Sequence, residues 1–307
     1  MAALALVAAA RLVAWDSRSV LVGLDALTPV LFLPAWPVAV AAAAGRRPWL
    51  CTAATLVVVA HIGFMLPELS ASTPVAAAAR SAPSFRLFDA NVFTGNTDAA
   101  GYAAEITRQR PDLVILEEPT PAFVAALEQT GALAPLPYRL EVSRSDPFTS
   151  LVASRWPLRD ADVLSVDGRP ITRRATIDPA GRSLQLLAVH VVAPLGGDRA
   201  EWARELRAVR DAVAAASASG PVLVAGDFNA TWGNRPFRAL LDAGLTDAAA
   251  ARGEPLEMTW PRNIRVVPAM LRIDHVLTTR GLTVTRIRTG SGHGSDHRPL
   301  VADVVLA

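Results

Sequence analysis

Lysine is absent from this sequence, and cysteine occurs only once, at Cys51. A single cysteine excludes an internal disulfide, but it carries no information about the redox compartment, because a chain of 307 residues can be held together by its hydrophobic core. All 30 basic residues are therefore arginines. Since alanine is also abundant, we attribute this bias to a GC-rich coding sequence rather than to selection for phosphate binding.

An excess of one charge is also lacking in most of the chain. Residues 1–80 contain five arginines against Asp16, Asp25 and Glu68, which leaves 25 of the 30 basic residues and 25 of the 28 acidic residues for residues 81–307. A nucleic-acid-binding domain typically carries a clustered positive surface, and this neutral balance gives no support for one. Nucleic acid stays possible as a partner but is not favoured by charge.

Apolar residues, by contrast, make up 51% of the sequence and are concentrated in residues 1–67. Residues 20–44 are long enough to cross a bilayer and contain a single charge, at Asp25, while residues 49–66 form a second candidate without a formal charge. Residues 2–15 are too short to cross unless an arginine among them reaches the interface. We therefore predict a transmembrane region of two or three helices. A cleaved signal peptide is the alternative, and the further apolar segments argue against it.

The tight link between the two longer apolar segments contains Arg46 and Arg47. Positive residues favour the cytoplasmic side, so this link predicts a multi-pass protein of the cell membrane whose C-terminal domain is extracellular. Arg11 and Arg18 compete at the other end of the first segment. Residues 68–83 are small, polar and proline-containing, as expected of a short linker.

The remainder of the chain, residues 84–307, alternates short apolar runs with amphipathic segments. This alternation predicts an α/β domain without internal repeats. The predicted strands are 85–92, 112–116, 151–154, 173–178, 184–192, 223–225, 272–278, 282–288 and 300–306. The predicted helices are 99–109, 121–128 and 201–216, of which the last carries a clear apolar stripe.

The stretch VLVAGDFNATWG, residues 222–233, ends a buried strand with polar side chains. Because side chains alternate along a strand, Asp227 and Asn229 are expected to point the same way where the strand ends. A carboxylate and a carboxamide on a rigid strand end suit a site that handles water and phosphate oxygens. The same letters also suit an ordinary turn, since Asp, Asn and Gly are favoured there.

Other polar residues that can act in catalysis recur at or near predicted strand ends. They are Asn91, Glu117, Glu118, His190, Asp274, His275, Asp296 and His297. Taken singly, each has a structural explanation, as a turn residue, an exposed strand end or a satisfied core histidine. Their shared placement across most of the domain instead predicts a single site.

The segments FRLFDANV, PDLVILEE, SLVASRWPL, LAVHVV, GDFNATW, RIDHVL and GSDHRPL, in this order, resemble the endonuclease/exonuclease/phosphatase superfamily. That family includes nucleases, abasic-site endonucleases, neutral sphingomyelinases and inositol-polyphosphate phosphatases. GDFN, IDH and SDHRP together are a specific combination, and the resemblance covers residues 84–307, most nearly to membrane-tethered bacterial members. It implies a four-layer α/β sandwich of two facing β-sheets flanked by helices, preceded here by the transmembrane helices. It also implies hydrolysis of a phosphate ester with Mg²⁺ or Mn²⁺ as cofactor.

The resemblance further implies which residues hold the metal and the water. Asn91 and Glu118 correspond to the family's metal site, and Asp296 is expected near this metal or a second cation. Asp227 corresponds to the residue that orients or deprotonates the attacking water. Asn229 corresponds to one that hydrogen-bonds the phosphoryl oxygens.

The same resemblance gives the histidines their roles. His297 is expected against the scissile phosphate, as a general base or as a cationic stabiliser, with Asp274 orienting its ring. His190 is expected to donate to a non-bridging phosphate oxygen. Glu117 is interpreted only as a neighbour of Glu118.

Several other residues are given no part in the chemistry. His275 follows Asp274 on a strand and is expected to face away from the site, and His293 is expected in a flexible loop. Trp232 and Trp260 either form a rim on which a base or sugar stacks or anchor loops.

These observations predict a membrane-anchored, divalent-metal-dependent phosphoric ester hydrolase with its catalytic domain outside the cell. The substrate stays open among a nucleic acid, a lipid headgroup and a small phosphoester, as do the number of metal ions and the oligomeric state. The competing hypothesis is a catalytically inactive relative that acts as a membrane-linked binding domain. The presence of every expected site residue argues against it.

Overall fold

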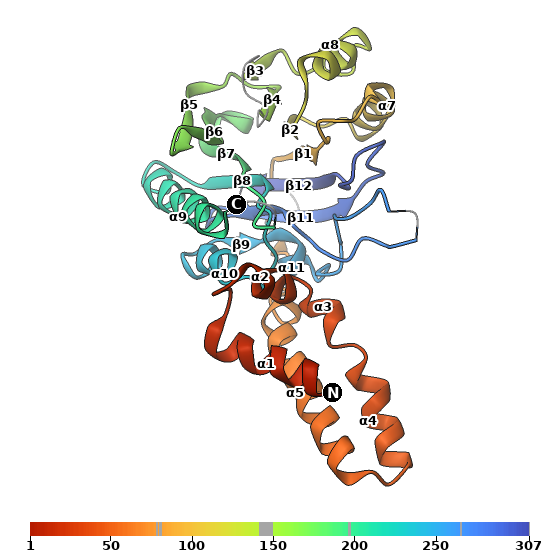
Figure 1. Cartoon of the computed structure of the whole chain (residues 1–307). Coiled ribbons are helices and arrows are strands. Elements are labelled where there is room, and N and C mark those ends of the chain that lie inside the picture. The colour runs from red at the N-terminus through yellow and green to blue at the C-terminus, as the bar shows by residue number, and fades with distance from the viewer. Residues whose placement is uncertain (78, 80–81, 141–149, 196–197, 265, 307) are drawn as a thin grey trace.

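The computed structural model describes residues 1–77, 79, 82–140, 150–195, 198–264 and 266–306. In this part of the chain, two β-sheets lie face to face with helices on their outer surfaces, and the N-terminal helices project from one end of that two-sheet body (Figure 1). The predicted α/β arrangement of two facing sheets flanked by helices is confirmed. Three residues of the predicted linker, at positions 78, 80 and 81, lie outside the described residues.

The described helices and strands have the following bounds. The helices are α1 (Ala2–Ala14), α2 (Ser19–Ala26), α3 (Thr28–Leu31), α4 (Ala35–Ala44), α5 (Pro48–Leu69), α7 (Ala99–Gln109), α8 (Pro121–Gln129), α9 (Arg199–Ala216), α10 (Arg235–Asp242) and α11 (Ala248–Arg252). The strands are β1 (Ser84–Asn91), β2 (Leu113–Glu117), β3 (Tyr138–Leu140), β4 (Ser150–Ser154), β5 (Arg159–Val166), β6 (Arg169–Ile177), β7 (Leu184–His190), β8 (Val222–Asp227), β9 (Thr246–Asp247), β10 (Asp274–Thr278), β11 (Leu282–Thr289) and β12 (Leu300–Leu306).

The order of the strands brings polar strand ends together. The first sheet runs β11-β12-β1-β2-β4-β3 and the second β5-β6-β7-β8-β10-β9. Each contains a parallel pair, β1 with β2 and β7 with β8, and parallel strands end at the same edge of a sheet. Asn91 therefore lies beside Glu117, and His190 beside Asp227. In the antiparallel pairing of β8 with β10, Asp274 lies opposite Asp227.

Three apolar clusters hold the four layers together. Between the sheets, Leu87, Ile115, Leu186 and Val276 belong to a cluster of buried side chains drawn from alternate strand positions. On the outer faces, α7 and α8 cover the first sheet, and α9 and α10 cover the second. Strands buried on both faces read as continuous apolar runs, which is why the central strands were predictable. Each fully buried aliphatic side chain contributes about 1.5–3 kcal/mol.

One described helix, α5, is long and apolar enough to cross a membrane, with 22 residues. At ~1.5 Å per residue it is about 33 Å long, close to the ~30 Å of a bilayer core. The predicted span over residues 20–44 is not one straight helix, because α2 and the segment 28–44 are bent by 68° relative to each other. Three prolines lie within or next to this bent segment and disfavour a continuous helix. By length and composition, the described helices therefore offer one span, or two if the bent pair crosses as a unit.

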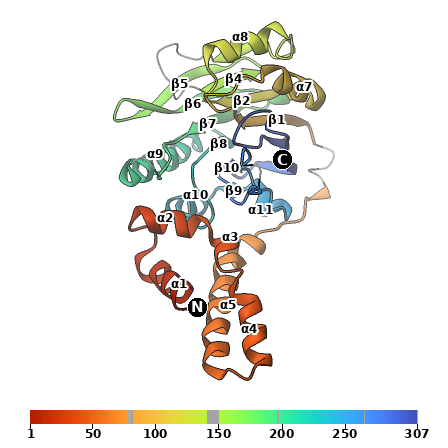
Figure 2. The ribbon, with the colours of Figure 1, turned by 45° about the vertical axis from the view of Figure 1, so that its right-hand side comes forward.

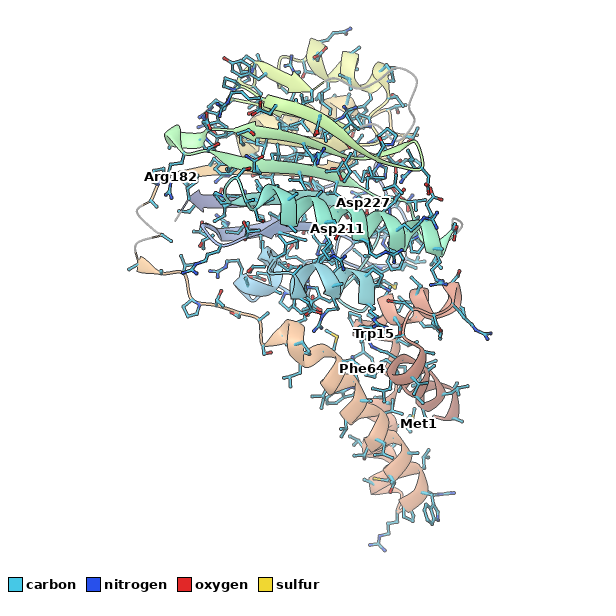
Figure 3. The ribbon with its side chains drawn as sticks, turned by 90° about the vertical axis from the view of Figure 1, so that its left-hand side faces the viewer. Met1, Trp15, Phe64, Arg182, Asp211 and Asp227 are labelled. Carbon is cyan, nitrogen blue, oxygen red and sulfur yellow. The ribbon has the colours of Figure 1, made fainter. Side chains whose placement is uncertain are left out.

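The link between α1 and α2 is bonded to the two-sheet body. Trp15 Nε1 donates to Gly233 O at 2.7 Å, and Asn234 Nδ2 donates to Asp16 Oδ1 at 3.0 Å. A side chain at Gly233 is excluded, because a Cβ atom there would lie 1.9 Å from the carbonyl oxygen of Asp25. Figure 3 shows Trp15 where the N-terminal helices meet the body. These contacts fix α2 against α10, as the view in Figure 2 also shows.

The C-terminal end of α5 is tied to strand β10 by buried charges. Glu68 accepts a hydrogen bond from Arg272 Nη2, and Arg272 Nη1 donates to Asp247 Oδ2 at 2.6 Å. The Nδ1 atom of His275 lies 2.9 Å from the same Asp247 oxygen. Arg272 lies two residues before Asp274, so α5 is fastened to the strand that begins with a predicted site residue. The predicted linker thus begins inside this helix and inside this network.

Candidate active site

All eight predicted site residues lie at the same end of the two facing sheets. Those on the first sheet come from the end of β1, the residue after β2 and the loop before β12, and those on the second come from β7, β8, β10 and the residues after β8. They are Asn91, Glu118, Asp296, His297, His190, Asp227, Asn229 and Asp274. Figure 3 shows Asp227 deep within the two-sheet body. Segments far apart in the sequence therefore meet at one place.

The Glu118 carboxylate is held in a fixed orientation by the loop after β1. Its Oε2 atom accepts from the backbone N of Thr94 at 3.1 Å and from Thr94 Oγ1 at 2.9 Å, while Oε1 accepts from Asn91 Nδ2 at 3.0 Å. Glu118 also adopts a φ of 58°, in the left-handed region that non-glycine residues rarely occupy. Burial acts to raise the pKa of Glu118, but His190 and these hydrogen bonds outweigh it and lower that pKa overall. The carboxylate is therefore kept charged at the edge of the site.

Asp227 ends β8 at a point where the backbones approach closely. A Cβ on Gly226, whose φ is 137°, would lie 1.9 Å from the carbonyl oxygen of Val189, so only glycine fits before Asp227. Asp227 Oδ1 accepts from the Asn229 backbone N at 2.8 Å, and Oδ2 accepts from Asn91 Nδ2 at 3.1 Å. Burial, with the nearby Asp274 charge, raises the pKa of Asp227 to about 7. Asp227 and Asn229 both line the site, and Asn229 Nδ2 donates to Asp227 Oδ2 at 3.3 Å. Their proximity does not come from strand alternation as predicted, because β8 ends at Asp227 and Asn229 has a φ of 46°.

His297 is held by Asp274 on one side of its ring. Its Nδ1 lies 2.9 Å from Asp274 Oδ2, and its Nε2 points toward Asp227 and Asp296, at 3.9 and 4.0 Å. Burial alone lowers the pKa of this imidazole, but Asp274 and the other carboxylates outweigh burial and raise the pKa to about 10. At neutral pH His297 is therefore a cation with a proton on Nε2. The Ser295 hydroxyl fixes the loop, because it donates to Asn91 O at 2.7 Å and accepts from the His297 backbone N at 2.9 Å.

His190 has the opposite charge state. It is almost fully buried at the end of β7, and its Nε2 lies 3.6 Å from Glu118 Oε1. Burial lowers the pKa of His190 to about 4, against the opposing effect of Glu118. The site thus combines one neutral and one cationic imidazole, which suits groups that donate hydrogen bonds to different parts of an anion.

Asp296 lies beside His297, and Trp260 holds its carboxylate. Trp260 Nε1 donates to Asp296 Oδ2 at 3.2 Å, and the backbone N of Arg262 donates to Asp296 O at 2.8 Å. The other tryptophan considered from the sequence, Trp232, donates to Asp247 Oδ2 at 2.9 Å instead. Of the two, Trp260 lines the site and Trp232 anchors a loop.

Six of the eight predicted residues line a cavity of about 370 Å³. Its polar side is formed by the described residues Glu118, His190, Asp227, Asn229, Asp296 and His297. Its remaining walls are mainly apolar and come from the loop after β1, the segment after β7 and the residues before β10. Helix α2 also contributes Val22, Gly23 and Ala26. A polar surface beside apolar walls is the usual form of a small-ligand site.

The donor set fits a divalent cation. Asp227, Asp274 and His297 present possible ligand atoms within 4.8 Å of one another, so this cluster can hold a metal ion. A ligand role for His297 requires that the metal displace its proton, because only a neutral imidazole binds a metal. Glu118 adds a charged carboxylate, and hard cations such as Mg²⁺ prefer carboxylate oxygens. Converging like charges raise the energy of the site, and a bound cation offsets that repulsion. Asn91 differs from the expectation in one respect, because its Oδ1 accepts from Phe93 N at 2.9 Å and its Nδ2 faces both carboxylates. A ligand role for the amide oxygen therefore requires the amide to turn.

The structure also adds site residues that the sequence did not reveal. Thr94 orients Glu118, Arg169 lines the cavity, and Arg169 Nη1 lies 2.7 Å from both carboxylate oxygens of Glu205. Thr94 could not be predicted as a site residue, because a serine or threonine three residues after an asparagine such as Asn91 is common in any protein. Beneath the site, burial raises the pKa of Asp89 and of Glu117 well above their ordinary values.

Two histidines lie outside the site. His275 faces away from it, with Nε2 at 2.9 Å from Ala230 O, as expected. His293 was expected in a flexible loop, but its Nε2 lies 2.7 Å from Glu105 Oε2 and its ring stacks edge-on against Tyr102. It therefore anchors the loop that precedes His297.

This fold and this arrangement of carboxylates, amides and histidines are consistent with the class of phosphoester hydrolases and nucleases built on two facing sheets. A sequence profile of the Endonuclease/Exonuclease/phosphatase family matches residues 90–297, which is more than half of the chain. The chain belongs to the Endonuclease/Exonuclease/phosphatase family.

Individual relatives are more distant. A UPF0294 protein of Yersinia pseudotuberculosis serotype O:1b is 33% identical over 135 residues, covering 40% of this chain and 43% of the relative, and a UPF0294 protein of Yersinia pestis matches to the same extent. The chain thus matches less than half of the length of these relatives.

Two solved structures show the same fold. TDP2 from D. rerio, complexed with a single-strand DNA product, gives a TM-score of 0.62 at 18% identity and covers 72% of this chain and 98% of its own. An endonuclease/exonuclease/phosphatase family protein from Bacteroides thetaiotaomicron gives 0.61 at 16% identity, covering 74% and 99%. At these identities the likeness shows the fold alone.

Proposed function

We propose that this protein is a membrane-anchored, divalent-metal-dependent phosphoric ester hydrolase. The observation that carries this proposal is the convergence of Glu118, His190, Asp227 and His297 on one cavity from both sheets. A structural role for each residue taken alone does not account for that convergence. Family membership supports phosphoester chemistry in general, and the choice of these residues as its agents is our inference.

The proposed metal ligands are Glu118, Asn91 and Asp296, with Mg²⁺ or Mn²⁺ as the ion. When bound, the cation supplies positive charge that polarises the phosphoryl group and offsets the negative charge that develops on it. Asp296 lines the same cavity as Glu118 and suits this ion or a second one.

The side chains of the chain itself position water, substrate and protons. Asp227 accepts a proton from the attacking water, and Asn229 lies beside it to bind a phosphoryl oxygen. His297 carries a proton on Nε2 that faces the cavity, and Asp274 holds the ring through Nδ1. This geometry favours the cationic stabiliser over the general base for His297. His190, neutral and buried, donates to a non-bridging oxygen.

The activity test uses the full chain in detergent with bis(p-nitrophenyl) phosphate. We expect nitrophenol release with Mg²⁺ or Mn²⁺ and none with EDTA, because the carboxylate cluster needs a cation to bind a phosphate anion. Glu118→Ala and His297→Ala should each lower kcat/KM by about 100-fold or more, the usual effect of removing such a group.

Asp211→Ala is the control. This carboxylate pairs with Arg210 on the exposed face of α9, outside the described lining of the cavity, so the variant should keep its activity within about twofold. Unchanged activity in Glu118→Ala or His297→Ala would refute the assignment of these residues. A folded full-length protein that hydrolyses no phosphoester would favour the alternative of an inactive, membrane-linked binding domain.

The location of the protein is part of the same proposal. Helix α5 supports an anchor in the cell membrane, and the apolar segment 28–44, part of which packs against α5, supports a second pass, since α2 itself packs on the two-sheet body. The positive link at Arg46 and Arg47 favours a position outside the cell for the domain from residue 84 onward. A nucleic-acid substrate is supported by the DNA-bound D. rerio structure, but the neutral charge of residues 81–307 does not favour it.

A further inference from the structure

A helix of the N-terminal region forms part of the wall of the cavity. Val22, Gly23 and Ala26 of α2 line the same cavity as Glu118 and His297. Val22 is 1% exposed and packs in the cluster that joins β7, β8, α9 and α10. Asn234 Nδ2 donates to Val22 O at 3.1 Å, which fixes the helix at this position. The wall is therefore built into the fold.

Two further lining residues of the cavity, Leu195 and Phe93, carry exposed apolar side chains. Leu195 is 59% exposed, and a Cβ at Gly23 would lie 3.3 Å from Leu195 Cδ1, so this leucine and α2 lie against each other. Phe93 is 40% exposed and has a φ of 64°. A left-handed conformation costs about 1–3 kcal/mol for such a residue, and strain of this size is typical of functional sites. Exposed apolar groups that line a cavity indicate an apolar ligand group.

The charges of the cavity argue against a polyanionic chain. A nucleic acid needs cations for the phosphates on each side of the reacting one. The arginine among the described lining residues, Arg169, already bridges both oxygens of the Glu205 carboxylate. The lining thus offers polar groups for one phosphate and apolar walls for the rest of the substrate.

The apolar wall is continuous with the helices that form the proposed anchor. From α2 the chain runs directly into α3 and α4, and Figure 2 shows these helices leading away from the two-sheet body beside α5. Leu33, Trp36, Leu56 and Val59 on these segments and on α5 are between 43% and 65% exposed, as expected of lipid-facing side chains. The cavity mouth therefore lies next to the proposed membrane surface.

From these observations we propose that the substrate is a phosphoester lipid taken from the bilayer that anchors the protein. The phosphate lies against the polar side, and the first carbons of the lipid chain lie against the apolar wall that Leu195 forms together with α2 and Phe93. Water adds its oxygen to phosphorus, the ester P–O bond breaks, and the leaving oxygen is released with a proton, so no other reactant is needed. This inference rests on the hydrolase proposed above.

The test varies one substituent of a chromogenic phosphodiester. The full chain in detergent is assayed with the methyl, octyl and thymidine 5′ esters of p-nitrophenyl phosphate, all of which release nitrophenol. We expect kcat/KM to be at least about 10-fold higher for the octyl than for the methyl ester, as burial of two methylenes predicts. The thymidine ester should not exceed the methyl ester by more than about twofold. The hexadecyl ester in phosphatidylcholine vesicles should be hydrolysed as well, because the source of the substrate is the bilayer.

Variants of the wall identify the apolar contact. Leu195→Asp should lower the octyl-to-methyl ratio at least fivefold, and Phe93→Ser should lower it in the same direction. Val163→Asp is the control, because Val163 is 43% exposed on β5 and outside the described lining, and it should leave the ratio unchanged.

The two proposals fail in different ways. Metal-dependent hydrolysis of the methyl ester with no gain for octyl, or a clear preference for thymidine, would overturn the lipid inference and keep the hydrolase. A ratio unaffected by both Leu195→Asp and Phe93→Ser would also overturn it. Absence of metal-dependent hydrolysis for every ester would instead overturn the proposed function.

Discussion

The ring of His297 lies between carboxylates on both of its nitrogens. The Asp274 carboxylate is hydrogen-bonded to Nδ1. The carboxylates of Asp227 and Asp296 lie 3.9 and 4.0 Å from Nε2, too far for a hydrogen bond. Asp227, for its part, is buried and close to Asp274. Asp274 therefore raises the pKa of both groups: it is the main cause of the rise at His297, and it adds to the effect of burial at Asp227.

This dependence predicts a pH profile. Asp227 must be ionised to accept a proton, so activity should rise with pH through about 7. A nearby cation favours the charged carboxylate, so saturating metal should move this rise to lower pH. His297 must keep its proton, so activity should fall as pH passes about 10. The measurement is kcat/KM for bis(p-nitrophenyl) phosphate between pH 5 and pH 11.

Asp274→Asn tests the cause of that profile. The variant removes the main charge that raises the pKa of His297, and burial then lowers it, so the alkaline limb should move down by roughly 1–3 pH units. Because the same carboxylate raises the pKa of Asp227, the acid limb should move down too. An alkaline limb that stays in place would show that Asp274 does not set the charge of His297.

At the level of single residues, the sequence motifs predicted the polar residues that line the cavity, but they did not predict the loop residues that position them. Asp227, Asn229 and His297 were readable because a strand end or a distinctive segment marks them. Thr94 and Phe93 were not, because their positions depend on a loop conformation that the letters do not encode. Phe93 has a φ of 64°, which a bulky residue adopts only when its surroundings impose it.

Among the secondary-structure elements, the buried strands were predictable from the sequence and the exposed ones were not. The central strands are buried on both faces and were found, while β5 is exposed along most of its length and has no apolar period to detect. Helix α10 was also missed, although Asn234 followed by an arginine and a proline is a recognisable helix start. The three prolines of residues 20–44 predict a kink in that segment, but the packing of α2 on the two-sheet body was not expected, because composition alone cannot distinguish a membrane span from a helix that packs on a domain.

The attachment of α5 to β10 gives a prediction about stability. Glu68→Ala should lower the free energy of unfolding by about 3 kcal/mol, since breaking a buried ion pair leaves Arg272 with less compensation. Thermal unfolding of the full chain in detergent measures the change. Asp211→Ala removes a carboxylate that pairs with Arg210 on the exposed face of α9, labelled in Figure 3, and should cost less than about 1 kcal/mol. Equal effects of both variants would contradict a structural role for the Glu68 contact.

At the scale of the whole molecule, the position of the two-sheet body relative to the membrane follows from one short turn. Arg46 and Arg47 lie between α4 and α5, at the end of the anchor farthest from the body (Figure 1). If α5 crosses the bilayer, this turn and the body lie on opposite sides, and the positive charges favour the cytoplasm for the turn.

Protease treatment of intact cells tests this orientation. A C-terminal epitope tag should be removed without permeabilisation, while a cytoplasmic control protein stays intact. Complete protection of the tag in intact cells, together with its loss after lysis, would place the domain inside.

The contact of Gly233 with the Asp25 carbonyl has a consequence for how such a protein can be modified. Gly233 belongs to the same stretch, residues 222–233, as Asp227 and Asn229. The segment that carries these two proposed catalytic residues therefore also provides the close contact with helix α2. A chimera with another protein's anchor in front of residue 84 would keep the polar residues of the site, but its cavity would lack the wall that α2 forms. A chimera that keeps the cavity intact therefore has to keep α2 together with the domain from residue 84 onward.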